Sequence, residues 1–312
     1  MLNPLQLQTL QAVLRTGSFA DAARELGYTG SAVSQQIAAL ERATRTQLFE
    51  RHAHGISPTP IAQFLAERAN QVLGQLRTLE DDIVLQQNGT IGRVRLGSFP
   101  SAAERLLPDA ISRFQYTHPG VVVHLDEGEP DELFRMLEAH ELDVALVYRY
   151  GAVPIRVPRG FEAEFVFREA LYLLLPSGHP RCDDDEPLRV DRLQDDSWIT
   201  ARAGTAGGST LRRLCAETGF EPMIVHRSNN YSVIHGLVAA GLGIAVVPEL
   251  SLRPTEGVVS RRVDGEKAYR DVMALRSPTL PDASWETLRH ALLAATDRSS
   301  AFRTARGEWT TA

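Results

Sequence analysis

The segment from residue 29 to residue 36 carries small and amide side chains that suit the reading of base edges. They are Thr29, Ser31, Ala32, Ser34, Gln35 and Gln36. Glutamine can bond adenine through two hydrogen bonds, alanine can contact a thymine methyl group, and serine can bond a base or a phosphate. Thr29 and Ser31 have a second possible role as caps of the following helix. The segment predicts contacts in the major groove of DNA.

Three short helical periodicities would position these side chains. Their apolar members are Leu7, Leu10, Val13 and Leu14, then Phe19, Ala22, Ala23 and Leu26, then Val33, Ile37 and Leu40. Gly17 ends the first segment, Ser18 is a suitable N-cap for the second, and the glycine-bounded turn 27–30 leads into the third. Two helices joined by such a turn, with another packed beneath, form a helix-turn-helix.

The charge balance limits how such a segment can hold DNA. The 312 residues contain 33 basic and 39 acidic side chains, a net charge of −6, and a single lysine, Lys267. Residues 1–66 hold five arginines against four acids. Binding through bulk positive charge is therefore not expected, and DNA contact must be local and dependent on shape.

A compact loop or hairpin over residues 48–60 precedes a long helix, which we expect from Thr59-Pro60 to about Gln87. Its apolar residues alternate in steps of four and three: Leu65, Ala69, Val72, Leu76, Leu79 and Ile83. An amphipathic helix lying on its own domain would give a related pattern. The 3.5-residue repeat favours dimerisation with a second chain through these residues.

Beyond the break at residues 88–92, short β-rich runs alternate with helical stretches, which predicts an open α/β fold in two subdomains. Ligands of such folds bind at the carboxyl ends of strands and at helix N-termini. The candidate effector-binding residues at those ends are Ser98, Phe99, Pro100, Ser101, Glu129, Tyr148, Arg149, Thr200, Arg202, Ser228 and Asn229.

Several of these residues have an ordinary structural alternative. Ser101 together with Glu104 has the pattern of a capping box, and Glu129 and Asn229 are placed to cap the helices that follow them. Arg149 and Arg202 suit either ion pairs or a small organic anion, and the anion is the effector class that we expect.

The N-terminal motifs Gly17-Ser18-Phe19, Ala22-Ala23, Ala32-Val33-Ser34, Leu40-Glu41 and Leu48-Phe49-Glu50-Arg51, followed by Thr59, resemble the signature of LysR-type transcriptional regulators. Leu142-Asp143 and the run from Ala240 to Pro248 also resemble this family. The chain departs from the family pattern at Gly30-Ser31, where a Gln-Pro pair is usual, and at His54, where a basic residue is common.

The resemblance implies a winged helix-turn-helix at 1–58, a linker and dimerisation helix at 59–90, and a tail at 301–312. Between them, at 91–300, it implies an effector module similar to periplasmic binding proteins, with subdomain I at about 91–160 and 267–297 and subdomain II at about 161–266. It adds Arg51, His54 and Thr59 to the predicted DNA contacts. The implied partners are a pseudo-palindromic promoter site, a small-molecule effector, a homodimer or homotetramer, and RNA polymerase.

Other classes of function have little support in the sequence. There is no GxSxG, HExxH or lysine-bearing phosphate loop, so we expect no enzyme and no cofactor. Cys182 and Cys215 are isolated and lack metal-ligand spacing, which predicts reduced thiols. No membrane span and no secretion signal are expected, which indicates a cytoplasmic protein. The alternative that stays open is an architectural DNA-binding protein that needs no effector.

Overall fold

The computed structural model describes residues 2–52, 55–87, 92–151, 153, 155, 157–158, 160–184, 187–278 and 280–298. The chain divides into two compact units, which are described separately. The first comprises Met1–Arg93 and Arg135–Leu142, and the second comprises Val94–Phe134 and Asp143–Ala312. Among the described helices, none is both long enough and apolar enough to cross a membrane. The predicted tail at 301–312 lies outside the described residues.

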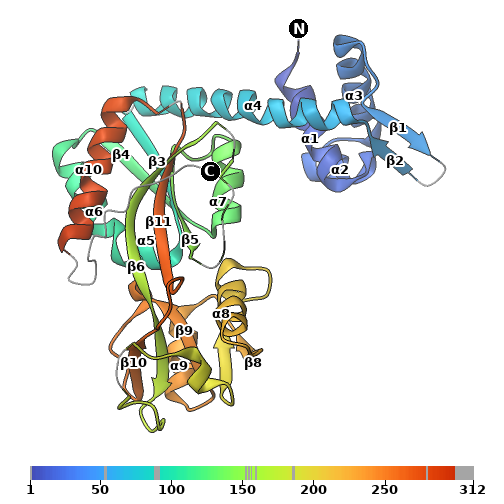
Figure 1. The fold of residues 1–312 in the computed structure, drawn as a ribbon. Coiled ribbons are helices and arrows are strands. Elements are labelled where there is room, and N and C mark those ends of the chain that lie inside the picture. The colour runs from blue at the N-terminus through green and yellow to red at the C-terminus, as the bar shows by residue number, and fades with distance from the viewer. Residues whose placement is uncertain are drawn as a thin grey trace. The chain divides into compact units, whose positions relative to one another are not determined.

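Three short helices open the first unit: α1 (Pro4–Thr16), α2 (Phe19–Leu26) and α3 (Gly30–Thr44) (Figure 1). Each begins at a polar N-cap, because Asn3, Ser18 and Thr29 accept hydrogen bonds from the first free amides of their helices. Gly17 and Gly27 end α1 and α2 with φ near 70°, a left-handed conformation that glycine adopts without strain. Their apolar faces meet in one core, so the predicted helix-turn-helix is confirmed.

A two-stranded hairpin and a long helix complete this unit. Strands β1 (Phe49–His52) and β2 (Gly55–Pro58) pair antiparallel as the wing. The helix α4 (Pro60–Gln87) follows directly. Thr59 joins the two elements, because its hydroxyl donates to the carbonyl oxygen of Gln47 at 3.0 Å and accepts the N–H of Ala62 at 3.3 Å.

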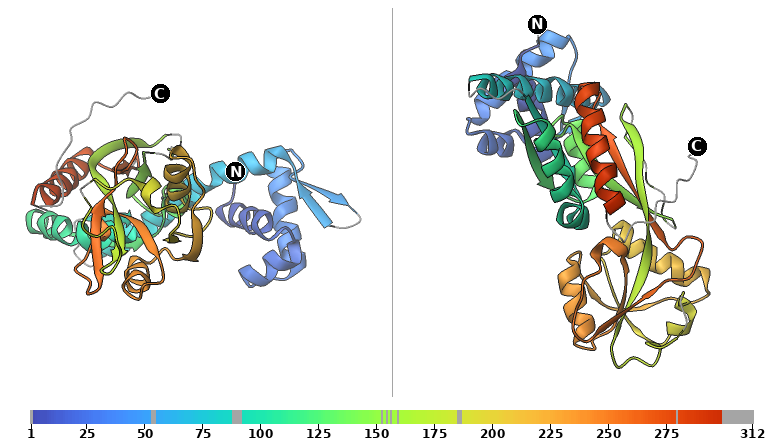
Figure 2. Two further views of the ribbon diagram at one scale, coloured as in Figure 1. Left: turned by 60° about the horizontal axis from the view of Figure 1, so that its bottom comes forward. Right: turned by 90° about the vertical axis from the view of Figure 1, so that its left-hand side faces the viewer.

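The second unit is a curled mixed sheet with helices on its faces, in two lobes joined by long strands (Figure 2, right). Its strand order is β4-β3-β5-β11-β6-β9-β7-β8, and β10 also pairs with β6. The strands are β3 (Gly92–Ser98), β4 (Val121–Glu127), β5 (Val144–Tyr150), β6 (Glu162–Pro176), β7 (Ser197–Thr200), β8 (Met223–Arg227), β9 (Ile244–Pro248), β10 (Val258–Arg262) and β11 (Tyr269–Arg276).

Helices cover both lobes of this sheet. They are α5 (Pro100–Arg105), α6 (Leu107–Thr117), α7 (Pro130–Glu138), α8 (Ala206–Glu217), α9 (Tyr231–Ala239) and α10 (Asp282–Arg298), with short 3₁₀ turns at Val190–Leu193 and Glu249–Ser251. The sequence between Ala102 and Tyr116 predicts one continuous helix, and this prediction is wrong, because the chain breaks at Leu106 between α5 and α6. In an unbroken helix, the ring of Pro108 would clash with the carbonyl of Glu104, whereas the first turn of a new helix accepts proline.

Two antiparallel strands at the middle of the sheet join its two lobes. The 15-residue β6 pairs with β11 over its first half and with β9 and β10 over its second half. Strand β11 also pairs with β5, so β11 lies between two strands and is buried on both faces. Because side chains alternate along an extended strand, neighbouring side chains of β11 lie on opposite faces of the sheet, which matters for the site described next.

Candidate DNA interface and effector cleft

Helix α3 separates its core residues from its candidate DNA contacts. Val33, Ile37 and Leu40 are buried beneath it. Ser31 and Gln35 are exposed, while Ala32 and Ser34 are half-buried near the same end of the helix. Thr29 is the N-cap: its oxygen accepts the N–H of Ala32 at 3.2 Å and lies 3.0 Å from the Ser31 hydroxyl. The structure thus presents an open helix end with small and amide side chains.

Two of the predicted DNA contacts are held by groups of their own domain. The amide of Gln36 is hydrogen-bonded to the hydroxyl of buried Thr9 on α1. Thr59 is bonded to Gln47, which precedes the wing, and to the start of α4, as described above. The side chain of Arg51 and the whole of His54 lie outside the described residues. Ser31, Ser34 and Gln35 are therefore the strongest candidates for base contacts.

The predicted dimerisation stripe of α4 divides between two faces. Leu65, Ala69 and Leu76 pack on the core of the helix-turn-helix, and Ala69 is only 2% exposed. Their own domain covers Ala69 and only partly covers Leu65 and Leu76, so the assignment of these three to a dimer interface stays a prediction, for which Ala69 has the least support. Val72, Leu79 and Ile83 are 48%, 58% and 51% exposed. Ile61 and Phe64 extend this exposed apolar face. One face of α4 therefore packs on its own domain, while another exposes an apolar stripe.

The second unit gathers polar residues where its two lobes meet. Ser101 is the second residue of α5 and is buried, so it does not cap that helix as the capping-box alternative required. Its hydroxyl accepts a hydrogen bond from the guanidinium of Arg270 at 2.9 Å. Ser98 and Phe99 are also buried beside it, and Pro100 is the first residue of α5.

Arg270 is the centre of this cluster, and sequence reasoning missed it. Its Nε donates to the Glu169 carboxylate at 2.6 Å, and the other oxygen of Glu169 accepts the N–H of Leu250 at 2.6 Å. The side chains of Glu169 and Arg270 are 0% and 1% exposed. The guanidinium lies over the rings of Phe99 and Tyr148, at 4.7 Å and 4.9 Å from their centroids. These are cation–π distances, so aromatic faces shield a charge that water cannot reach.

Three tyrosines border this ion pair. The hydroxyl of Tyr148 donates to Glu129 at 2.5 Å, and Tyr150 is hydrogen-bonded to Tyr231. Burial, followed by the charges of Tyr150 and Glu129, raises the pKa of Tyr148 well above its ordinary value. Burial tends to lower the pKa of Arg270, but Glu169 and the tyrosines outweigh it and raise that pKa overall. The cluster therefore holds neutral tyrosines around a charged arginine.

Arg149 and Arg202 each make a hydrogen bond within the effector module. Arg149 on β5 donates to Asp271 on β11 at 3.0 Å, and Arg168 on β6 donates to the same carboxylate at 2.6 Å. Asp271 is fully buried, so the ion-pair alternative holds for Arg149. The backbone N–H of exposed Arg202 donates to the side chain of Asn229 at 2.9 Å. Asn229 thus joins two loops and does not cap α9, whose cap is Asn230.

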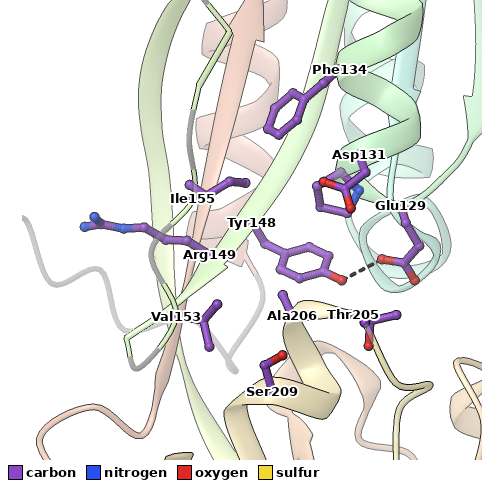
Figure 3. Close-up of a pocket in the computed structure, with 12 residues that line it drawn as sticks. Glu129, Asp131, Phe134, Tyr148, Arg149, Val153, Ile155, Thr205, Ala206 and Ser209 are labelled. Atoms are coloured by element: carbon purple, nitrogen blue, oxygen red, sulfur yellow. Dashed lines mark hydrogen bonds between the residues drawn. The ribbon is translucent and has the colours of Figure 1, made fainter.

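Three cavities surround the Arg270 cluster. A cavity of about 300 Å³ is lined by Glu129, Asp131, Phe134, Tyr148, Arg149 and Thr205, among others (Figure 3). A second, of about 560 Å³, is lined by Ser101, Glu104, Glu127, Asn229, Tyr231 and Arg253, among others. A narrow space of about 20 Å³ between Tyr150, Thr200 and Tyr231 is the third. Figure 3 shows Tyr148 reaching toward Glu129 while Arg149 leaves the strand in another direction.

The glycine-rich segment 204–209 forms the N-cap and the first turn of α8. The amide of Gly208 is bonded to the Thr205 hydroxyl at 3.3 Å, and the amide of Ser209 to the Thr205 carbonyl at 3.1 Å. A Cβ at Gly208 would lie 2.7 Å from the carbonyl oxygen of Arg202. Glycine is required there for close packing of the backbone.

A winged helix-turn-helix joined to a two-lobed α/β module with cavities between its lobes defines a ligand-responsive DNA-binding protein. Residues 5–63 match the model of the bacterial regulatory helix-turn-helix protein, lysR family, and residues 87–297 match that of the LysR substrate binding domain. The chain belongs to the LysR family of transcriptional regulators, and its relatives are named as regulators and not as enzymes.

Curated relatives and solved structures agree with this assignment. The chain is 30% identical over 254 residues to the probable HTH-type transcriptional regulator LrrA of Synechococcus elongatus, covering 81% of this chain and 83% of that protein. It is 32% identical over 246 residues to the regulator CbbR of Sinorhizobium medicae, covering 78% and 75%. Full-length CbnR in complex with its target DNA has the same fold, with a TM-score of 0.62, 20% identity, and coverage of 94% of this chain and 100% of CbnR.

The missed residues had a weak signal in the sequence. Glu169 lies in the middle of β6 and Arg270 is the second residue of β11, and both are buried. A charged residue inside a strand covered on both faces needs a partner of opposite charge. The sequence could therefore have indicated that each of these residues belongs to a buried ion pair. That signal does not say which partner each one takes, because 101 residues separate them.

Proposed function

We propose that the protein binds a pseudo-palindromic promoter site as a homodimer or homotetramer. Each dimer would place two α3 helices in major grooves one helical turn apart, or a multiple of that distance. The proposal places the protein in the cytoplasm. At this DNA site the protein would also contact RNA polymerase. We assign residues 1–58 to the DNA-binding domain, 59–90 to the linker and 91–300 to the effector module.

The observation that carries this proposal is the division of exposed side chains in the first unit. Ser31 and Gln35 are exposed at the N-terminal end of α3, where Ser34 is half-buried. Val72, Leu79 and Ile83 give α4 an exposed apolar stripe. An apolar stripe along a helix favours burial against a second copy, and pairing of two chains would bring two α3 helices to one DNA duplex.

We further propose that a small polar molecule binds in the effector module and shifts the arrangement of its two lobes. The cavities lined by Glu129 and Ser101 support this proposal, since each combines hydroxyl or amide groups with apolar walls. The coupling requires a molecule that binds two arrangements of the lobes with different free energies. The expected organic anion has less support, because Arg149 is bound to Asp271 and Arg202 lines neither cavity.

Footprinting on genomic fragments tests the proposal directly. We expect a protected stretch with two related half-sites, and a change in protection or bending when the right metabolite is added. The promoter beside the gene itself is the first fragment to use, since a regulator of this kind commonly controls a neighbouring gene. Protection that is absent on every fragment, with or without metabolites, would contradict sequence-specific binding.

A further inference from the structure

The Arg270–Glu169 ion pair is bordered by residues that line three cavities of the effector module. Ser101, which bonds Arg270, lines the 560 Å³ cavity, and Tyr148, which stacks on Arg270, lines the 300 Å³ cavity. Tyr150, whose ring centroid is 6.0 Å from the guanidinium, lines the narrow space. The pair itself lines none of these three cavities and lies buried behind residues that do.

The surroundings of Arg270 have the features of a binding site for a carboxylate. The guanidinium is 1% exposed, flanked by aromatic rings, and bonded to one carboxylate oxygen at 2.6 Å. The other carboxylate oxygen is held by a backbone N–H at 2.6 Å. Two convergent donors in a dry, aromatic pocket would bind a free carboxylate well. Here the carboxylate belongs to the chain itself.

The other guanidinium groups that line the two larger cavities each lie near a carboxylate. The 300 Å³ cavity is lined by the carboxylates of Glu129 and Asp131 and by one guanidinium, Arg149, which Asp271 binds. The 560 Å³ cavity is lined by Glu104, Glu127 and Arg253. Arg253 lies 3.7 Å from Glu104 and donates to Ser232 at 2.7 Å. In both cavities carboxylates outnumber guanidinium groups, and a carboxylate already lies beside each guanidinium.

We propose that Glu169 is a built-in occupant of a carboxylate-binding site formed by Arg270, the Leu250 amide and the rings of Phe99 and Tyr148. This inference rests on the proposed effector binding and narrows its chemistry. A tethered carboxylate acts at a high effective concentration, so a free carboxylate does not displace it. A carboxylate effector of the natural chain would then not bind on Arg270, and the effector would bind beside the ion pair.

Removal of the internal carboxylate tests the proposal. Glu169→Ala leaves Arg270 without its counter-ion and opens space beside it, which acetate can fill. We expect the variant to unfold at a lower temperature than the natural protein. Sodium acetate should then raise its Tm by several degrees, increasing with the logarithm of acetate concentration, because a ligand that binds only the folded state stabilises it. Acetamide and sodium chloride at matched concentration should give no such rise.

Matched variants separate this effect from general stabilisation by salt. Glu129→Ala removes another carboxylate of the cleft, whose partner is the Tyr148 hydroxyl and not a guanidinium, so acetate should not restore its Tm. The double variant Glu169→Ala with Arg270→Met removes the site itself and should also lose the response. The natural protein should respond equally to acetate and chloride. An equal acetate shift in the natural protein and Glu169→Ala, or in the double variant and Glu169→Ala, would overturn the proposal.

If Glu169→Ala does not fold in ordinary buffer, refolding from denaturant supplies the measurement. Folded protein should then be recovered in acetate and not in acetamide or chloride, and equal recovery in all three would overturn the proposal. None of these measurements uses DNA. Failure of the anion site therefore appears as an absent acetate effect, whereas failure of the proposed function appears as an absent footprint.

Discussion

The DNA-binding domain and the effector cleft use polar side chains in opposite ways. In the first, the caps Asn3, Ser18 and Thr29 bond amides two or three residues away, and Gln35 stays exposed. In the second, Glu169, Arg270 and Ser101 are buried and bond partners 81 to 169 residues distant. The first region leaves polar side chains exposed to other molecules, whereas the buried polar side chains of the second region bond to one another and stabilise the fold. Substitutions should therefore alter binding in one region and stability in the other.

The largest effect should follow from charging the exposed stripe of α4. Leu79→Asp with Ile83→Asp should give monomers, because burial of each such side chain contributes about 1.5–3 kcal/mol and both protomers lose two. Sedimentation velocity measures the change, and circular dichroism should show unaltered helix content. Val233→Asp, at a 46% exposed position on α9, is the control. An unchanged sedimentation profile would remove α4 from the dimer interface.

The cleft should respond to loss of its cation with a loss of stability. Arg270→Met leaves Glu169 buried without a partner, which should cost roughly 3–5 kcal/mol. Denaturant unfolding of the effector module measures this loss. Lys267→Met breaks the exposed Lys267–Glu217 pair near the same strand and should cost about 1 kcal/mol or less. Equal losses in the two variants would show that the buried Arg270–Glu169 pair contributes no more to the free energy of unfolding than an exposed pair does.

Base recognition should depend on Ser34 and Gln35 without changing the stability of the domain. Ser34→Ala with Gln35→Ala should weaken operator binding by about 1–3 kcal/mol relative to scrambled DNA, as loss of base contacts does. Fluorescence anisotropy on both DNAs measures the ratio. Gln36→Ala should instead lower the Tm, because it breaks the bond to buried Thr9. Equal weakening on operator and scrambled DNA would limit α3 to contacts with the backbone.

The smallest effect concerns pH. His235 is buried between Thr255 and the Ser251 carbonyl, and burial, followed by the charge of Arg253, lowers its pKa. The unfolded chain then binds more protons, so stability falls as pH falls below about 6.5, by at most about 1.4 kcal/mol per pH unit. His235→Gln should flatten the dependence of Tm on pH between 7 and 5. The exposed His124→Gln is the control, and an equal flattening there would contradict this role.

Local patterns predicted the first unit well. Ser18 capping α2 and Gly17 ending α1 follow from bonds within one or two turns, which the sequence displays directly. The division of α4 was not predicted, since its 3.5-residue repeat covers two faces that only packing separates. Ala69 lies on the face covered by the core, whereas Leu79 remains exposed on the other.

The family, most of the element order and the candidate DNA-reading helix follow from the amino-acid sequence by itself, because they depend on periodicity, caps and motifs within a few turns. The partner of each buried charge was decided only by tertiary structure. Strands β6 and β11 bring Glu169 and Arg270 into register from positions 101 residues apart. Burial then makes that pairing obligatory, since an unpaired charge away from water is too costly to keep.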